Sequence, residues 1–156
     1  MLFRGAGVIS QYLFCVLAIK RRINKMAELK ELYQSADWKK EKHIPVIDAA
    51  AKAKKGEWIP VVVTVGKEIA HPNTTAHHIR WIEVYFQAKG EKFPYQLARA
   101  EFVAHGESAQ GADTSTIFTH PEAIFKFKSD KPGTIFASSY CNIHGLWQSA
   151  NDIEIE

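Results

Sequence analysis

The stretch "IRWIEVYFQA", residues 79–88, decides the fold class of this chain. Most of its residues are β-branched, aromatic or aliphatic, a composition that favours β-strands. Turn-forming segments such as "AKG", "GESAQGADTS" and "SDKPG" separate it from similar runs. Short strands at this spacing predict an antiparallel β-sandwich or barrel. The other runs of strand length are "WIPVVVTVG" (58–66), "YQLARAEFVA" (95–104), "AIFKFK" (123–128) and "TIFASSYC" (134–141).

The length and composition indicate a single globular domain. The chain has 156 residues, of which 46% are hydrophobic and 24% are charged, and this is enough for one well-packed core. Residues 26–36, "MAELKELYQSA", have a helix-forming composition with Leu29, Leu32 and Tyr33 on one face. We therefore expect one all-β domain over residues 26–156 that begins with a short N-terminal helix.

Residues 1–25 differ from the rest of the chain in charge. They hold five basic residues and no acidic residue, whereas residues 26–156 hold 15 basic and 17 acidic residues. The net charge of +3 therefore comes from this leader, and a nucleic-acid-binding fold loses its support. The apolar run at 5–19 is short for a spanning helix, and most of the basic residues follow it, unlike in a secretory signal. We interpret residues 1–25 as a disordered leader, or as an extension that arises because the start of translation is assigned too early, ahead of Met26. Both are favoured over a membrane anchor.

Cysteine and histidine point to a metal site. The two cysteines, Cys15 and Cys141, are too few for a disulfide framework, which fits a reducing, cytoplasmic compartment. Five of the seven histidines fall in loops or at strand ends, where a rigid sheet positions functional residues. The segment "HPNTTAH" (71–77) carries two imidazoles, and "CNIH" (141–144) can place a thiolate and an imidazole on one metal.

The donor set alone leaves three alternatives open. One thiolate with several imidazoles differs from the cysteine-rich sets of structural zinc and iron–sulfur sites. A blue-copper electron carrier is the main competitor of an iron site, because it uses two histidines and one cysteine on a β-sandwich. Its usual axial methionine is missing after Cys141, since Met1 and Met26 are the chain's methionines. A glutamine or carbonyl axial ligand keeps copper open, and a metal-free interaction domain is the third alternative.

Four segments together resemble the one-iron superoxide reductases, the neelaredoxin group related to the iron-binding domain of desulfoferrodoxin. They are "EKHIPVI", "GKEIAHPNTTAHHIRWIEVYF", "AEFVAHGES" and "YCNIHGLW", and the similarity runs from about residue 35 to the C-terminus. The resemblance implies an immunoglobulin-like β-sandwich and a mononuclear non-haem iron with four imidazole ligands and one axial thiolate. The ligands that it implies are His43, His71, His77, His144 and, as the axial thiolate, Cys141.

The resemblance also implies an activity and its partners. The reaction is the one-electron reduction of superoxide to hydrogen peroxide, with an external electron donor such as rubredoxin restoring the iron. Glu41 would close the sixth position of the ferric iron, and Lys42 would lie beside the open site. Without the resemblance, these two residues could equally be a solvated charge pair. We expect a homo-oligomer, of which a tetramer is one form, with no nucleic-acid or membrane partner.

Periodicity does not choose between His77 and His78. Adjacent residues of a strand face opposite sides, so only one of the two can reach the metal. The apolar alternation at 82–86 shares parity with His78, whereas Ile79 and Trp81 share it with His77. The resemblance favours His77.

The remaining histidines and two asparagines are expected around the site rather than in it. Histidine ligands usually have their second ring nitrogen held by a neighbouring group. The candidates for shaping these contacts are Asn73, Asn142 and Gly145. The histidines expected in packing or at the surface are His78, His105 and His120.

Overall fold

The computed structural model describes residues 28–156. The predicted leader at 1–25 and its boundary at Met26 lie outside the described residues, and both stay predictions. The chain divides into two units, one ending at Glu31 and one spanning Leu32–Glu156, and each is described by itself. No helix among the described residues is long and apolar enough to cross a membrane.

The helix expected over 26–36 is reduced, in the described residues, to a single 3-10 turn, Leu29–Glu31. Helices shorter than about 12 residues are marginal in water unless an apolar face packs against other elements. Here the apolar residues Leu29 and Leu32 are exposed. The composition of the segment is therefore not sufficient to make it a longer helix.

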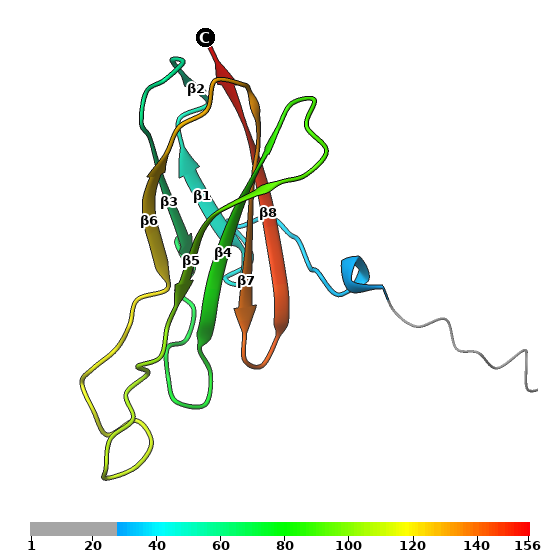
Figure 1. The fold of residues 1–156 in the computed structure, drawn as a ribbon. Helices are drawn as coiled ribbons and strands as arrows, with labels where there is room; N and C mark the ends of the chain where they lie inside the picture. Colours follow the sequence, from blue (N-terminus) through cyan, green and yellow to red (C-terminus); the bar gives the residue numbers. More distant parts are fainter. Residues whose placement is uncertain (1–27) are drawn as a thin grey trace, which may run out of the picture. The chain divides into compact units, whose positions relative to one another are not determined.

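Residues 32–156 form the predicted immunoglobulin-like antiparallel β-sandwich (Figure 1). One sheet has the strand order β1-β3-β6, and the other has the order β2-β8-β7-β4-β5. All neighbouring strands are antiparallel except β2 and β8. All five predicted strands form, whereas β1, β2 and β8 were not predicted. The strands are β1 (Pro45–Ala49), β2 (Lys52–Ala53), β3 (Ile59–Val65), β4 (Ile79–Ala88), β5 (Tyr95–Glu101), β6 (Glu122–Phe127), β7 (Gly133–Cys141) and β8 (Gly145–Ile155).

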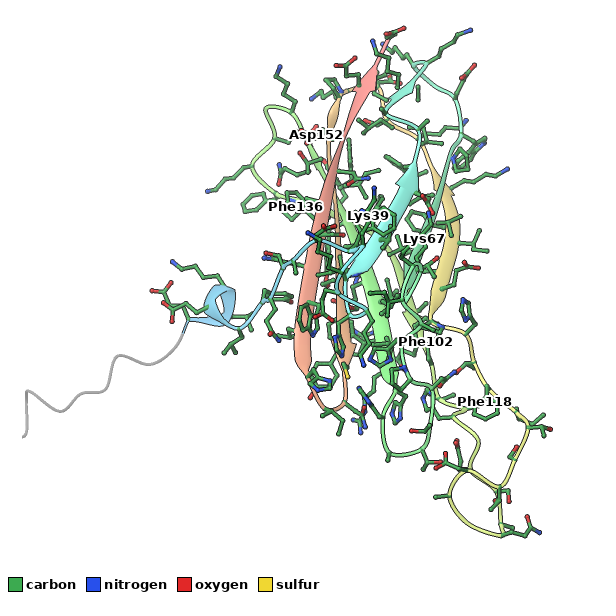
Figure 2. The ribbon with its side chains drawn as sticks, turned by 180° about the vertical axis from the view of Figure 1, so that it is seen from behind. Lys39, Lys67, Phe102, Phe118, Phe136 and Asp152 are labelled. Atoms are coloured by element: carbon green, nitrogen blue, oxygen red, sulfur yellow. The ribbon has the colours of Figure 1, made fainter. Side chains whose placement is uncertain are left out.

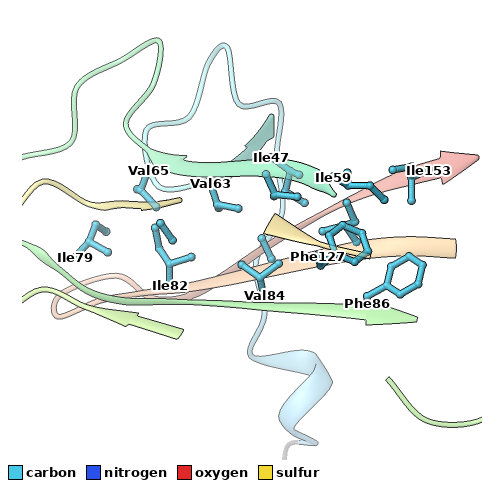
Figure 3. Packing of buried hydrophobic residues seen from close by; sticks show 14 of the residues in the cluster. Ile47, Ile59, Val63, Val65, Ile79, Ile82, Val84, Phe86, Phe127 and Ile153 are labelled. Atoms are coloured by element: carbon cyan, nitrogen blue, oxygen red, sulfur yellow. The ribbon is translucent and has the colours of Figure 1, made fainter. Parts of the chain in front are cut away.

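The core lies between the two sheets and is built from alternating residues of the strands (Figure 3). Val61 and Val63 of β3 face Ile82 and Val84 of β4, and all four side chains are 0% exposed. Burying an aliphatic side chain of this size contributes about 1.5–3 kcal/mol. The core therefore supplies a rigid frame whose strand ends hold the loops discussed below.

A β-bulge interrupts the pairing of β4 with β7 near the start of β4. Ile79 pairs with Cys141, but the next pair is Trp81 with Tyr140, so Arg80 is an extra residue on β4. A bulge of this kind shifts the alternation of side chains by one position. Ile79 and Ile82 are consequently both buried although they are three residues apart.

Truncating a buried core residue should destabilise the sandwich strongly. We expect Ile82→Ala to lower the free energy of unfolding by about 2–5 kcal/mol, because it removes buried methyl groups and leaves a cavity. The matched change Ile124→Ala removes the same atoms from a side chain that is 72% exposed, and it should cost less than about 1 kcal/mol. Urea unfolding of the two variants measures both values, and equal losses would contradict this assignment of the core.

Candidate metal centre

Three strand ends bring the predicted ligands together. His43 precedes β1, His71 and His77 lie in the loop between β3 and β4, and Cys141 ends β7. Because β4 and β7 are antiparallel, the start of β4 and the end of β7 lie at the same end of the sheet (Figure 1). The Oγ of Ser139, a β7 residue that is 0% exposed, donates a hydrogen bond to the backbone oxygen of His43 at 3.2 Å.

Four of the predicted ligands form one compact group of donors. One ligand atom from each of His43, His71, His77 and Cys141 lies within 4.8 Å of the others. Cys141 is a free cysteine and is 0% exposed. Three imidazoles and a thiol at this spacing could hold a transition metal.

His144 completes a ring of imidazoles around this group. Neighbouring ring centroids are 4.7 Å apart for His43–His71 and His71–His77, 4.9 Å for His77–His144 and 4.6 Å for His144–His43. The diagonal from His43 to His77 is longer, at 6.1 Å. The Nδ1 atom of His144 lies 3.0 Å from His43 Nε2 and 3.6 Å from Cys141 Sγ. The four rings therefore follow one another in the order of a closed quadrilateral, with the thiol beside them.

The hydrogen bonds of the rings direct unprotonated nitrogens toward this centre. His71 Nδ1 donates to the carbonyl of Pro72 at 2.6 Å, and His43 Nδ1 lies 2.5 Å from Glu41 Oε1. In a neutral imidazole the other nitrogen, Nε2, then carries a lone pair. The Nε2 atoms of His71 and His77 are buried without a hydrogen-bond partner in the described residues. Buried polar atoms are rarely left unpaired, so this arrangement fits a bound metal ion.

Burial keeps these imidazoles in the neutral form that binds metals. It lowers the pKa of His71 from 6.5 to about 4, and it also lowers the pKa of His43 and His77. The hydrogen bond with His43 lowers the pKa of Glu41, so this carboxylate is ionised and accepts the His43 Nδ1 proton. A metal therefore meets little competition from protons near neutral pH.

The bulge in β4 explains why periodicity could not choose between His77 and His78. The alternation at 82–86 lies beyond the bulge, and the bulge shifts the side-chain alternation by one position. Counting back from 82–86 therefore assigns the residues before Ile79 to the wrong face. His77 faces the donor group, whereas His78 packs flat on His105, with ring centroids 3.7 Å apart and an interplanar angle of 9°. His78 Nδ1 donates to the carbonyl of Thr74 at 3.0 Å.

The other residues expected around the site hold loops rather than ligand rings. Asn73 Oδ1 lies 2.7 Å from His105 Nδ1, and Asn73 Nδ2 donates to the carbonyl of Thr119. His105 Nε2 contacts the carbonyl of Phe102, which Figure 2 shows near the loop that carries Phe118. His120 is exposed.

Three residues that contact the site were missed in the sequence: Trp147, Gln34 and Gly66. The Trp147 ring stacks on His43 with centroids 4.8 Å apart, and its Nε1 donates to the His144 carbonyl. Gln34 Nε2 donates to the same carbonyl at 2.8 Å. Gly66 has a φ of +82°, and a Cβ there would lie 2.6 Å from His71 N. The sequence around Trp147 ("WQ") and around Gln34 ("YQS") carries no signal for these contacts. The contacts depend on the β7–β8 hairpin and on the path that the chain takes near residue 34.

Comparisons with known proteins identify the family of this chain. The family model described as desulfoferrodoxin matches residues 35–150. The chain belongs to the desulfoferrodoxin family. Among members of this family, superoxide reductase of Pyrococcus furiosus is 53% identical over 128 residues, covering 82% of this chain and 99% of the relative. Neelaredoxin of Megalodesulfovibrio gigas is 47% identical over 126 residues, covering 81% and 97%.

A solved structure of this family has the same fold. The superoxide reductase (neelaredoxin) of Archaeoglobus fulgidus in the reduced form superposes with a TM-score of 0.75 at 56% identity. It covers 80% of this chain and 99% of its own. The desulfoferrodoxin match includes all the predicted site residues from Glu41 to His144.

The metal-free protein should lose stability as the pH falls from about 6.5 to about 4. Unfolded histidines protonate near 6.5, whereas His71 stays neutral down to about 4 in the folded state. The unfolded state therefore binds more protons in this range, and the contribution of His71 is present above 6.5 and lost below 4. We expect a loss of at most about 3 kcal/mol from His71. Urea unfolding at several pH values should give a shallower slope for His71→Gln, and an identical slope would contradict the burial of a neutral His71.

Proposed function

We propose that this protein is a superoxide reductase that converts superoxide to hydrogen peroxide at a mononuclear non-haem iron. The observation that carries the proposal is the ring of four imidazoles beside one buried thiol, in a chain that belongs to the desulfoferrodoxin family. A blue-copper site uses two imidazoles. The third and fourth imidazoles favour iron over this alternative.

Five residues would hold the iron. His43, His71 and His77 would bind it through Nε2, since the Nδ1 atoms of His43 and His71 are engaged elsewhere. His144 would bind through Nδ1, the nitrogen that lies near His43 Nε2 and Cys141 Sγ. Cys141 would supply the thiolate. When bound, the iron would supply the electron that superoxide needs, together with two protons, to become hydrogen peroxide.

The surroundings of these residues suit a small anionic substrate and solvent protons. A pocket of about 540 Å³ is lined by His43, His144, Trp147 and Lys42, and it gives water and superoxide access to the imidazoles. Cys141 is closed to solvent, which would protect a metal-bound sulfur from direct oxidation. Protons can therefore reach the reacting oxygen from the pocket without exposing the sulfur.

Lys42 would attract superoxide to this pocket. Burial is the main cause of the lowered pKa of His43, His71 and His77, and the positive charge of Lys42 is one of the smaller causes, so its field reaches these rings. The other lysine that lines this pocket, Lys40, forms an ion pair with Asp37 at 3.7 Å. Lys39 and Lys67 hold their ammonium groups 5.5 and 5.8 Å from the Trp38 ring centroid (Figure 2). Lys42 is therefore the cation that we assign to the approach of the substrate.

Glu41 would orient His43. Its Oε1 atom accepts hydrogen bonds from the Nδ1 atom of His43 at 2.5 Å and from the backbone N of His43 at 3.2 Å. A carboxylate partner on a ligand imidazole fixes the ring and raises its basicity. The role in closing the sixth position of ferric iron stays a prediction. An external electron donor such as rubredoxin, a homo-oligomeric state and a cytoplasmic location also stay predictions.

The first test is the metal and its thiolate band. The purified protein should contain about one iron per chain and, when oxidised, show a visible thiolate-to-iron absorption band. Cys141→Ser should abolish the band because it removes the sulfur ligand, whereas Cys15→Ser should keep it. Metal analysis with absorption spectra checks both. Copper in place of iron, or an unchanged band in Cys141→Ser, would overturn the proposal.

The second test is the role of Lys42 in substrate approach. At a separation of about 6 Å, one unit charge changes the energy of superoxide by roughly 0.7–2.8 kcal/mol for dielectric constants between about 80 and 20. Lys42→Ala should therefore slow the second-order reaction with superoxide by roughly 3- to 100-fold and make it less sensitive to salt. The iron spectrum should stay the same.

The matched control is Lys92→Ala, which removes the same charge in the connection after β4, at the far end of that strand from His77. Pulse-radiolysis rates at two ionic strengths measure both variants. Equal rates for Lys42→Ala and Lys92→Ala would show that Lys42 is a solvated charge with no role in the approach of superoxide.

A further inference from the structure

The two ligand-bearing segments around β4 and β7 continue past the end of the strand ladder. The last pair of the ladder is Ile79 with Cys141. His77 lies two residues before Ile79, in a loop, and the turn at 142–144 follows Cys141. The pairing of the strands therefore does not by itself set the distance between the imidazole of His77 and the thiol of Cys141.

Asn142 continues the connection with three hydrogen bonds. Its backbone N donates to the carbonyl of His78 at 3.1 Å, and its Oδ1 accepts from the backbone N of His78 at 2.8 Å. Its Nδ2 donates to the carbonyl of Ala76 at 2.8 Å. The amide side chain thus bonds the residues on both sides of His77 and follows directly after Cys141 in the chain.

The hydrogen bonds of His77 itself stay inside its loop. Its backbone N donates to Thr74, and its carbonyl accepts from the backbone N of Thr74 at 3.0 Å. Within the described range 28–156, no other residue of the 142–145 turn hydrogen-bonds the 71–78 loop. Asn142 is therefore the direct tie between the two segments beyond the strand ladder, and two of its three bonds are made by its side chain.

We propose that Asn142 is a positioning residue that sets the separation between His77 Nε2 and Cys141 Sγ, and through it the affinity for iron. The inference rests on the metal site proposed above. The side chain must be a neutral amide, because the two contacts need one acceptor and one donor. An aspartate would keep the bond from His78 N but would set a carboxylate oxygen against the Ala76 carbonyl.

Asn151 provides a matched control at another place in the sandwich. Its Nδ2 also donates to the carbonyl of a neighbouring segment, that of Ile47, at 3.0 Å. It lies in β8, six residues beyond the start of that strand, and among the described residues its side chain hydrogen-bonds Ile47 rather than a proposed ligand. Asn151→Ala therefore removes a comparable cross-strand bond without touching the ligand segments.

The test measures ferrous iron affinity and the thiolate-to-iron band in the full-length variants. Loss of a group that holds ligands in place typically costs 10- to 100-fold in metal affinity. We expect about that loss, together with a shifted band, for Asn142→Ala, and a smaller loss for Asn142→Asp, which keeps one bond. Asn151→Ala should stay within about twofold of wild type with an unshifted band.

The outcomes separate this inference from the proposed function. Wild-type protein that binds no iron overturns both. If wild type binds iron and both asparagine-142 variants match it within twofold, or if Asn151→Ala loses as much as Asn142→Ala, only the role of Asn142 is overturned. If Asn142→Ala does not fold, the iron affinity of Asn142→Asp decides: a loss supports the role of Asn142, and an affinity within twofold of wild type overturns it.

Discussion

The pairing of β4 with β7 is the constraint on which the rest of the site depends. It sets Ile79 opposite Cys141 and includes the bulge at Arg80 that turns His77 toward the thiol. The same strand β7 holds the backbone of His43 through the buried hydroxyl of Ser139. A shift of this register by one residue would turn Cys141 away from the core side of its sheet and separate it from the imidazoles.

Without a metal, the centre contains buried polar atoms that lack hydrogen-bond partners in the described part of the chain, and a bound metal would satisfy them. Two buried imidazole nitrogens, on His71 and His77, lack partners in the described residues, and burial disfavours their protonation. Leaving a buried polar atom unpaired costs about 1–3 kcal/mol. The rigid core between the sheets, with Val61 and Ile82 fully buried, holds the strand ends and resists relaxation. Metal binding can offset this cost, because coordination uses the lone pairs that no hydrogen bond satisfies.

The sequence predicted the sandwich because its central strands have strong β-branched and aromatic patterns, as in 79–88. It did not predict β8, whose "QSAND" centre is polar and largely exposed, so its pairing with β7 depends on the tertiary context. The donors that converge in the structure were expected from the resemblance, whereas periodicity could not choose between His77 and His78 because a bulge is invisible to a count of parity. The contacts of Gln34 and Trp147 could not be predicted, since they join segments distant along the chain.

X-ray absorption at the iron edge of the reduced, iron-loaded protein tests the central claim most directly. The account predicts an iron shell with one sulfur and four imidazole nitrogens, because one thiol and four rings converge in the structure. A shell without sulfur, or one with only two imidazoles, would contradict it.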